Sequence, residues 1–337
     1  MRPTVSLQVL EQSGVGEARR TAAELGLLQG LSKARCSDLA IVVTELASNL
    51  VKHTSGGGTL LLNSRPGTVE VLTLDRGPGI SRMGEVLRDG YSTAGSAGTG
   101  LGAVSRLSED FDVYTAQGAG SVVYARLTEP AGDDLAGLPS SFDTSFDIGA
   151  VQTTYPGETV CGDDWTFSAG QTMLKLMVVD GLGHGLSAHE AARAAVAAFP
   201  HSSHLRPAET LTHIHQALRS TRGAVGAVAA IDVSAGTVQF AGVGNLSGVV
   251  LDAAQRRGLL SHNGTLGQET RTVQTQEVPW TPSSVLVVHT DGLTNRWDVS
   301  SAPGLLRRRA AVIAGVLYRD YARERDDATV VVVKAAP

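Results

Sequence analysis

The sequence predicts an α+β protein of two domains, each with β-sheet covered by helices. Its 337 residues are enough for two hydrophobic cores. Residues 129–144 are rich in Pro, Gly, Ser and Asp and have little periodicity, as is typical of a linker. On both sides of it, apolar runs of strand length alternate with runs of helical period. We therefore expect a first domain over 1–129, a linker over 130–144 and a second domain over 145–337.

Composition and charge favour a globular cytoplasmic protein. The net charge is only -5 and no basic stripe is present, so nucleic acid is not expected as a partner. No signal pattern opens the chain, and no apolar run approaches the roughly 20 residues of a membrane span, so no membrane association is expected. Cys36 and Cys161 fall in different halves without metal-site spacing, which favours two small buried residues.

Regular patterns fill the first domain. Helical period covers 16–28 and 32–53, and strand patterns cover 58–64, 68–74, 111–116 and 121–127, the last two as a hairpin. On the second helix, Glu45, Asn49 and His53 recur every four residues, on another face than the apolar stripe. A carboxylate, an amide and an imidazole in a row can hold a magnesium ion and a proton acceptor against a phosphate. The alternative is a solvated helix face.

Two glycine-rich turns follow in this domain. The strand over 68–74 ends in Asp75-Arg76-Gly77-Pro78-Gly79, where a carboxylate can accept the exocyclic amine of adenine and glycines let the backbone pass close to the base. Gly98, Gly100 and Gly102 lie at the start of a predicted helix, where free N–H groups favour an anion such as phosphate. A lone turn of this kind is weak support, because many are only helix starts.

Taken in order, three motifs resemble the ATP site of the gyrase, Hsp90 and histidine-kinase superfamily, which has the Bergerat (GHKL) fold. They are Thr44 to His53, Asp75 to Ile80, and Gly98 to Gly102. Asp89-Gly90-Tyr91-Ser92-Thr93, ahead of the last motif, is most similar to the small anti-sigma-factor and stressosome serine kinases. The resemblance covers about residues 16–127 and implies a two-layer α/β sandwich that binds ATP and Mg²⁺.

The same resemblance implies a role for each matched residue. Glu45 would be the base that accepts the proton of a substrate serine, Asn49 would coordinate magnesium, and Asp75 would contact adenine. Gly77 and Gly79 would shape the base pocket. The phosphates would be contacted by Gly98, Gly100 and Gly102. The sequence has no separate helical pair with an acceptor histidine, which disfavours an autophosphorylating histidine kinase.

The second domain is organised around Val178 to Gly185, an apolar run that ends in Asp180-Gly181. A carboxylate at a strand end, next to a glycine with an unshielded carbonyl, is a good ligand pair for a hard cation. Asp163, Asp291 and Asp326 also sit at the edges of apolar runs and are expected to converge on it. Strand patterns cover 146–153, 173–179, 226–232, 237–241, 285–288 and 329–333, and helical patterns cover 186–199 and 208–220.

Four motifs of this half resemble the metal-dependent serine/threonine phosphatases of the PPM (PP2C-like) superfamily, nearest to the compact bacterial stress and sporulation phosphatases. They are Gly162-Asp163, Asp180-Gly181, Asp291-Gly292 and Asp326-Asp327-Ala328-Thr329. The match covers about residues 145–334 and implies a four-layer α-β-β-α sandwich with two Mn²⁺ or Mg²⁺ ions.

In that resemblance Asp180 would bridge the two ions and so be central to catalysis. The Gly181 carbonyl would bind one ion, Asp291 and Asp326 the other, and Asp163 would act directly or through water. The neighbouring Asp164 and Asp327 are the alternatives, and the match favours the first aspartate of each pair, Asp163 and Asp326. His184 is interpreted as a residue of the helix start and not as part of the catalytic set.

Together the two resemblances imply a bifunctional regulator of a bacterial partner-switching pathway, with a serine/threonine kinase and a metal-dependent phosphatase in one chain. Its protein substrate would be an anti-sigma antagonist of the STAS type, and anti-sigma or stressosome components would be further partners. One alternative is a phosphatase gated by a first domain that senses nucleotide without transferring phosphate. The presence of Glu45 favours the kinase, because a pure binder needs no base. Another alternative is that the second half binds little metal and acts as a scaffold, with the kinase as the only enzyme. The four aspartates disfavour this alternative.

Overall fold

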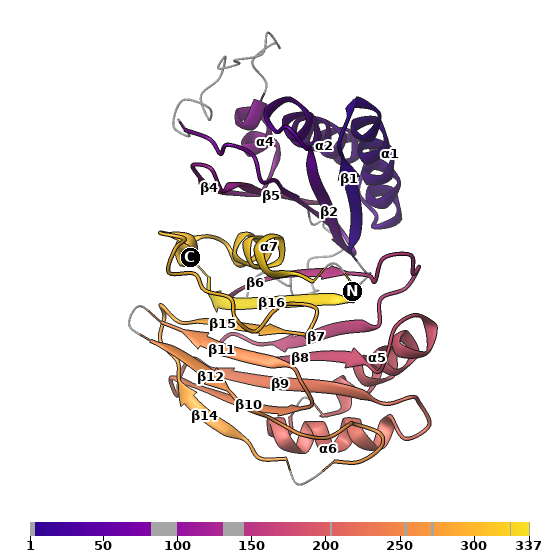
Figure 1. Ribbon diagram of the computed structural model, residues 1–337, viewed down its shortest axis with the longest axis vertical. Helices are drawn as coiled ribbons and strands as arrows, with labels where there is room; N and C mark the ends of the chain where they lie inside the picture. Colours follow the sequence, from indigo (N-terminus) through magenta and orange to yellow (C-terminus); the bar gives the residue numbers. More distant parts are fainter. Residues whose placement is uncertain are drawn as a thin grey trace. The chain divides into compact units, whose positions relative to one another are not determined.

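Figure 1 presents a computed structural model of the chain, which describes residues 4–81, 100–130, 145–202, 204–252, 255–270, 273–323 and 325–336. The chain divides into two compact units, Met1–Leu138 with Val299–Arg319, and Pro139–Asp298 with Asp320–Pro337. Each unit combines antiparallel sheet with helices, so the predicted α+β class is confirmed. Within the described ranges, no helix is long and apolar enough to cross a membrane.

The first unit contains one five-stranded antiparallel sheet in the order β1-β2-β3-β5-β4. Its strands are β1 (Val5–Val9), β2 (Gly58–Arg65), β3 (Thr68–Leu74), β4 (Asp110–Ala116) and β5 (Gly120–Thr128). Its helices are α1 (Gln12–Leu28), α2 (Lys33–His53), α4 (Gly100–Leu107) and α7 (Ala310–Tyr321), of which the last residues lie beyond the unit boundary. The Ser32 hydroxyl accepts a hydrogen bond from the Arg35 amide at 3.3 Å, which caps the start of α2.

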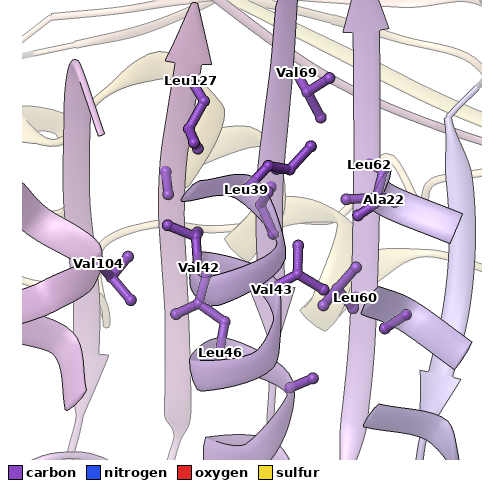
Figure 2. Close-up of a cluster of buried hydrophobic side chains, with 14 of the residues drawn as sticks. Ala22, Leu39, Val42, Val43, Leu46, Leu60, Leu62, Val69, Val104 and Leu127 are labelled. Carbon is purple, nitrogen blue, oxygen red and sulfur yellow. The ribbon is translucent and has the colours of Figure 1, made fainter. Parts of the chain in front are cut away.

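The helical period of α2 creates the main core of this unit. Leu39, Val42, Val43 and Leu46 are almost fully buried on one face of the helix. Figure 2 shows them against side chains of the sheet and of the neighbouring helices, with Ala22, Leu60, Leu62, Val69, Val104 and Leu127 around them. Burial of each Leu or Val contributes about 1.5–3 kcal/mol. Glu45 and Asn49 lie beside this apolar face of α2 and are half-buried.

The other face of the same sheet is also apolar and is covered by α7. A Cβ on Gly315 would lie 2.9 Å from both Leu72 and Val122, so the helix packs closely at a residue without a side chain. At the start of α7 the Arg309 guanidinium pairs with Asp110, and the Arg309 amide donates to Asp112 at 2.7 Å. The arginine run 307–309 is therefore tied to β4.

The second unit contains two sheets that face each other. The first has the order β13-β10-β9-β8-β7 with β14 beside β10, and the second has the order β12-β11-β15-β16-β6. All pairs are antiparallel except β10 with β13. The strands are β6 (Phe146–Thr153), β7 (Asp163–Ala169), β8 (Met173–Gly181), β9 (Ala224–Asp232), β10 (Thr237–Val243), β11 (Ser247–Leu251), β12 (Arg256–Leu259), β13 (Ser261–His262), β14 (Gln276–Pro279), β15 (Val285–His289) and β16 (Ala328–Ala335).

Two apolar layers hold the second unit together. Between the sheets, side chains such as Leu176 and Val178 of β8 pack with Leu286 and Val331 of the second sheet. On the outer face of the first sheet lie α5 (Leu186–Ala198), the short helix η2 (Phe199–Ser202) and α6 (Pro207–Ala217). Successive residues of β8 thus point alternately into one layer and the other, which explains its uninterrupted apolar sequence.

Candidate functional site

Strand pairing gathers the four predicted metal-site aspartates of the second unit. Asp163 begins β7 and lies directly opposite Asp180 near the end of β8. Asp291 follows β15 and Asp326 precedes β16, and these two strands pair antiparallel, so their loops meet at one edge. Positions up to 163 residues apart are thereby brought to one region.

A pocket of about 660 Å³ occupies this region. Asp180, Asp291 and Asp326 line it, together with Tyr155, Leu182, Gly183, His184, Val225, Gly244, Asn245, Asn263, Gly264 and Arg325. Asn245 donates its amide N–H to Oδ2 of Asp291 at 2.8 Å and holds that carboxylate in place. In the described part of the chain, no three His, Cys, Asp or Glu side chains already stand as a ready metal cluster.

Asp163 is not among the residues that line the pocket and is only 2% exposed. Its Oδ2 accepts a hydrogen bond from the Thr290 hydroxyl at 2.7 Å, whereas its Oδ1 is buried without a hydrogen-bond partner. Burial raises the pKa of Asp163, and burial together with the neighbouring carboxylates of Asp163 and Asp291 raises that of Asp180. A cation would satisfy the partnerless oxygen and offset the crowded negative charge, so this oxygen-rich donor set fits a hard divalent ion.

The two aspartates next to the predicted ligands have different partners. Asp164 accepts from the Trp165 amide at 2.8 Å and from Arg193 at 3.3 Å. Asp327 is 4% exposed and accepts from the amides of Tyr155 and Gly162, at 2.8 and 3.0 Å. These contacts give both side chains a structural task and favour Asp163 and Asp326 as the ligands.

Two glycines of this region are required by close backbone approach. A Cβ on Gly181 would lie 2.1 Å from the Ala188 carbonyl oxygen at the first turn of α5. A Cβ on Gly292 would lie 2.1 Å from the Asp327 carbonyl oxygen. Each glycine therefore lets the loop that carries an aspartate lie against its neighbour.

The predicted ATP-site residues lie in the first unit. Glu45 and Asn49 are half-buried, one turn apart on α2, and the exposed His53 ends that helix. Asp75 directly follows β3, and its Oδ1 accepts from the Gly77 amide at 2.8 Å, which fixes the carboxylate. A Cβ on Gly77 would lie 2.9 Å from the Thr54 methyl group, so the residue after α2 borders the Asp75 loop.

The glycines of this unit divide into three cases. Gly79 has φ +78°, and a Cβ there would lie 2.4 Å from the Ala116 carbonyl oxygen, so only glycine fits. Gly100 begins α4, Gly102 is buried in its first turn, and a Cβ on Gly100 would meet open space. Gly98 and the motif Asp89 to Thr93 lie outside the described residues.

Asn245 and His184 are among the pocket residues that the sequence did not assign to the site. Asn245 follows Gly244, which has φ +95°, after β10, and this glycine turn was the available signal. His184 lies within the very loop that carries Asp180, and a histidine among glycines gave too little information to separate a helix start from a site residue.

Comparison with known families gives one match for each unit. Residues 10–127 match the histidine kinase-like ATPase domain, and residues 170–336 match Stage II sporulation protein E (SpoIIE). The serine/threonine-protein kinase RsbT of Bacillus subtilis (strain 168) is 32% identical over 111 residues, which are 32% of this chain and 80% of that protein. The phosphoserine phosphatase RsbX of the same organism is 24% identical over 143 residues, 42% of this chain and 72% of that protein.

Two solved structures share the fold of over half of the chain. One, from "The bacterial stressosome: a modular system that has been adapted to control secondary messenger signaling", has a TM-score of 0.53 and 28% identity, covering 56% of this chain and 99% of the other. RsbX in complex with magnesium has a TM-score of 0.50 and 22% identity, covering 57% and 96%.

Proposed function

Because the chain belongs to the RsbT-like histidine kinase-like ATPase family in its first part and carries a SpoIIE/PP2C-type serine/threonine phosphatase domain in its second, we propose that it is a bifunctional regulator. It combines an ATP-dependent protein serine/threonine kinase with a phosphatase that removes the same kind of phosphate. The observation that carries the proposal is the set of aspartates around the pocket, in the same chain as the Glu45, Asn49 and Asp75 set.

In the proposed phosphatase site, Asp180, the Gly181 carbonyl, Asp291 and Asp326 would hold two Mn²⁺ or Mg²⁺ ions, with Asp163 supporting them. Two bound ions would lower the pKa of a shared water and stabilise charge on the phosphoryl group. Asn245 orients Asp291, and the Thr290 hydroxyl orients Asp163. Arg325, exposed at the pocket rim, supplies a positive charge for an incoming phosphoprotein.

In the proposed kinase site, α2 presents Glu45 as the base for a substrate hydroxyl and Asn49 as the ligand of Mg²⁺. Asp75 contacts the adenine amine, and Gly77 and Gly79 keep the backbone beside the base free of side chains. Gly100 and Gly102, at the start of α4, would contact the phosphates, and Gly98 is proposed to share this role. The relative RsbT is a serine/threonine-protein kinase, which supports this proposal.

The proposed substrate is a single-domain anti-sigma antagonist of the STAS type, and the proposed partners are anti-sigma or stressosome components. Support comes from the two relatives, a serine/threonine-protein kinase and a phosphoserine phosphatase, whose opposed chemistries are covalently joined here. A chain that adds and removes one phosphate would set the phosphorylation level of its target according to the supply of ATP and metal.

Transfer from γ-labelled ATP to proteins of the source cell's lysate tests both activities. In magnesium and manganese, the Asp180→Ala variant is expected to give a labelled protein band that is absent with the wild-type protein. Glu45→Ala in the same background should abolish the band, whereas the exposed Glu24→Ala on α1 should keep it. Equal labelling with and without Asp180 contradicts a shared target, and no labelling in either case contradicts the kinase.

A second candidate is a phosphatase gated by nucleotide. The segment Val299–Arg319 lies in the sequence between Asp291 and Asp326, yet it belongs to the first compact unit. There the Arg319 guanidinium donates to the Asp75 carbonyl at 3.2 Å, and Arg76 donates to the Arg319 carbonyl. Under this alternative the Glu45→Ala variant keeps the dependence of phosphatase activity on ATP, and an Asp75→Asn variant loses it.

A further inference from the structure

Strand β15 ends in a buried polar side chain that belongs to none of the sets assigned so far. Residues 285–288 of the strand are apolar, whereas His289, its last residue, is an imidazole with 0% exposure. A buried imidazole needs a hydrogen-bond partner for each ring nitrogen, which an apolar side chain at the same place does not. Because His289 directly precedes Thr290 and Asp291, its ring lies beside the loop that carries a proposed metal ligand.

Each nitrogen of the His289 ring has a partner. Nε2 accepts a hydrogen bond from the Trp297 indole N–H at 3.0 Å, and Nδ1 donates to the Thr290 carbonyl oxygen at 2.8 Å. A donor on one side and an acceptor on the other fix the neutral ring in a single tautomer. The Thr290 carbonyl belongs to the peptide plane that joins Thr290 to Asp291, so the ring also holds the backbone that enters Asp291.

The Thr290 hydroxyl group extends these contacts to a second carboxylate. It accepts from the Thr329 amide at 3.0 Å and donates to Oδ2 of Asp163 at 2.7 Å. The Thr329 carbonyl lies 3.5 Å from the same hydroxyl, so the shorter contact with Asp163 is the stronger one. With Oδ2 held in this way, the partnerless Oδ1 of Asp163 is the oxygen left to face a cation.

Trp297 lies at the other end of this series of contacts and is itself firmly held. Its side chain is only 2% exposed. The Arg256 guanidinium, from β12, lies 4.0 Å from the centroid of the indole ring and donates to the Trp297 carbonyl oxygen at 2.7 Å. Since the indole is fixed by burial and by the arginine, its N–H can hold the His289 ring in one orientation.

We propose that Trp297 is a positioning residue of the candidate metal centre. It acts on the Asp163 carboxylate through His289 and Thr290. The inference rests on the metal-dependent phosphatase function proposed above, and it adds a residue that contacts neither metal nor substrate. Groups that hold metal ligands by hydrogen bonds set the orientation of those ligands, and their loss typically lowers metal affinity about 10–100-fold. A tryptophan that only fills the core would affect the stability of the fold and leave metal affinity unchanged.

Mn²⁺ binding to the full chain tests this assignment. Trp297→Phe removes the indole N–H and keeps an aromatic ring, so it should raise the Kd for Mn²⁺ by on the order of 10-fold in isothermal titration calorimetry. The Mn²⁺ concentration that gives half-maximal hydrolysis of a phosphoserine peptide should rise in parallel, and saturating Mn²⁺ should restore most of kcat.

Trp280→Phe is the matched control, because Trp280 is also buried in the second unit, at 4% exposure, and takes no part in the contacts described above. It follows β14, whose pairing places Pro279 beside Thr237, at the end of β10 far from the pocket residue Gly244. This variant should leave both the Kd and the Mn²⁺ requirement unchanged. An equal loss of affinity in the two variants would indicate general destabilisation and overturn the assignment.

A second measurement uses the wild-type chain and therefore does not depend on the folding of a variant. In nuclear magnetic resonance spectra of the isotope-labelled protein, Mg²⁺ should shift the indole N–H resonance of Trp297 and leave that of Trp280 in place. A Trp297 resonance that stays fixed at saturating Mg²⁺ overturns the assignment, as does an unchanged Kd for Mn²⁺ in Trp297→Phe. If the wild-type protein binds neither ion, the phosphatase function fails together with the assignment, whereas wild-type binding with an unaffected variant refutes the assignment alone.

Discussion

The carboxylate of Asp180 combines two unfavourable conditions, since it is largely buried and it faces other carboxylates. Burial, then Asp163, Asp291 and Asp326, raise its pKa from 3.8 to about 9. A carboxyl whose pKa is higher in the folded state than in the unfolded state stabilises the fold below the unfolded value. That contribution is lost as pH rises through the folded value.

The metal-free protein should therefore lose stability as pH rises from about 4 to about 9. Asp180→Asn should raise the Tm in EDTA at the alkaline end by several degrees, at about 2–4 °C per kcal/mol for a unit of this size. Added Mn²⁺ should raise the Tm of the wild type and not that of the variant, as thermal melts at several pH values would reveal. A variant that melts below the metal-free wild type contradicts this account.

His289 gives the opposite pH dependence of stability from that of Asp180. It is fully buried, its Nε2 accepts from the Trp297 indole at 3.0 Å, and its Nδ1 donates to the Thr290 carbonyl at 2.8 Å. Only the neutral ring can make both bonds, and burial lowers its pKa below the usual 6.5. The stability it contributes is present above about pH 6.5 and is lost as pH falls through the lower folded value.

The wild-type protein should accordingly lose more free energy of unfolding between about pH 7 and about pH 5 than the His289→Gln variant, which has no proton to gain there. Urea titrations at both pH values measure the difference. Parallel losses in the two proteins would show that the ring does not titrate in this range.

Single residues also show how much of the candidate site could be predicted from the sequence. Asp180 and Asp291 are recognisable because each ends an apolar strand and precedes glycine. The resemblance already favoured the first aspartate of each adjacent pair, Asp163 and Asp326. The structure adds the hydrogen-bond partners of Asp164 and Asp327, which left no local pattern in the sequence. The contact between Glu158 and His184 joins residues 26 positions apart and left no local pattern.

At the level of elements, long amphipathic helices and buried strands were predictable, and short strands were not. The expected ranges of α2, β3, β6 and β8 agree with the structure to within a few residues. Strands β11 to β14 have two to five residues, too few for a period to emerge, and β1 has only five. Helix α7 was missed because it is buried on nearly all sides and therefore lacks a polar stripe.

The junction between β15 and β16 provides a test at this scale. Gly292→Ala should destabilise the protein by on the order of 1–3 kcal/mol or more, because the new methyl group meets the Asp327 carbonyl oxygen at 2.1 Å. Gly258→Ala in β12, where a Cβ meets nothing within 4 Å, is the control and should change stability little. Chemical denaturation of both variants measures the effect, and equal stabilities would contradict the crowding argument.

At the scale of the whole molecule, the compact units do not coincide with continuous halves of the sequence. The linker near residue 138 is the visible break in composition, but Val299–Arg319 returns to the first unit after most of the second has been passed. A sequence pattern reports local periodicity, whereas this assignment depends on which sheet face a distant helix covers. The domain division at 129 and 145 stays a prediction about family boundaries.

A fragment of residues 1–138 should therefore behave poorly alone. Without α7, the side chains of Leu72, Leu74 and Val122 lose their cover at Gly315, and an exposed apolar sheet face favours self-association. Attachment of residues 299–319 through a flexible linker should restore a monomer, as size-exclusion chromatography with light scattering would reveal. A monomeric, cooperatively folded fragment 1–138 would contradict the role given to α7.

The late position of α7 also sets an order of events during synthesis. A ribosome completes residue 138 long before it reaches residue 319, so the nascent ATPase unit waits with one sheet face uncovered while most of the phosphatase unit is being made. Domains of this kind usually mature from the N-terminus onward. Here the first unit to emerge is the one that cannot be finished until the second is almost complete, so a half-made chain does not yet contain a finished ATPase unit.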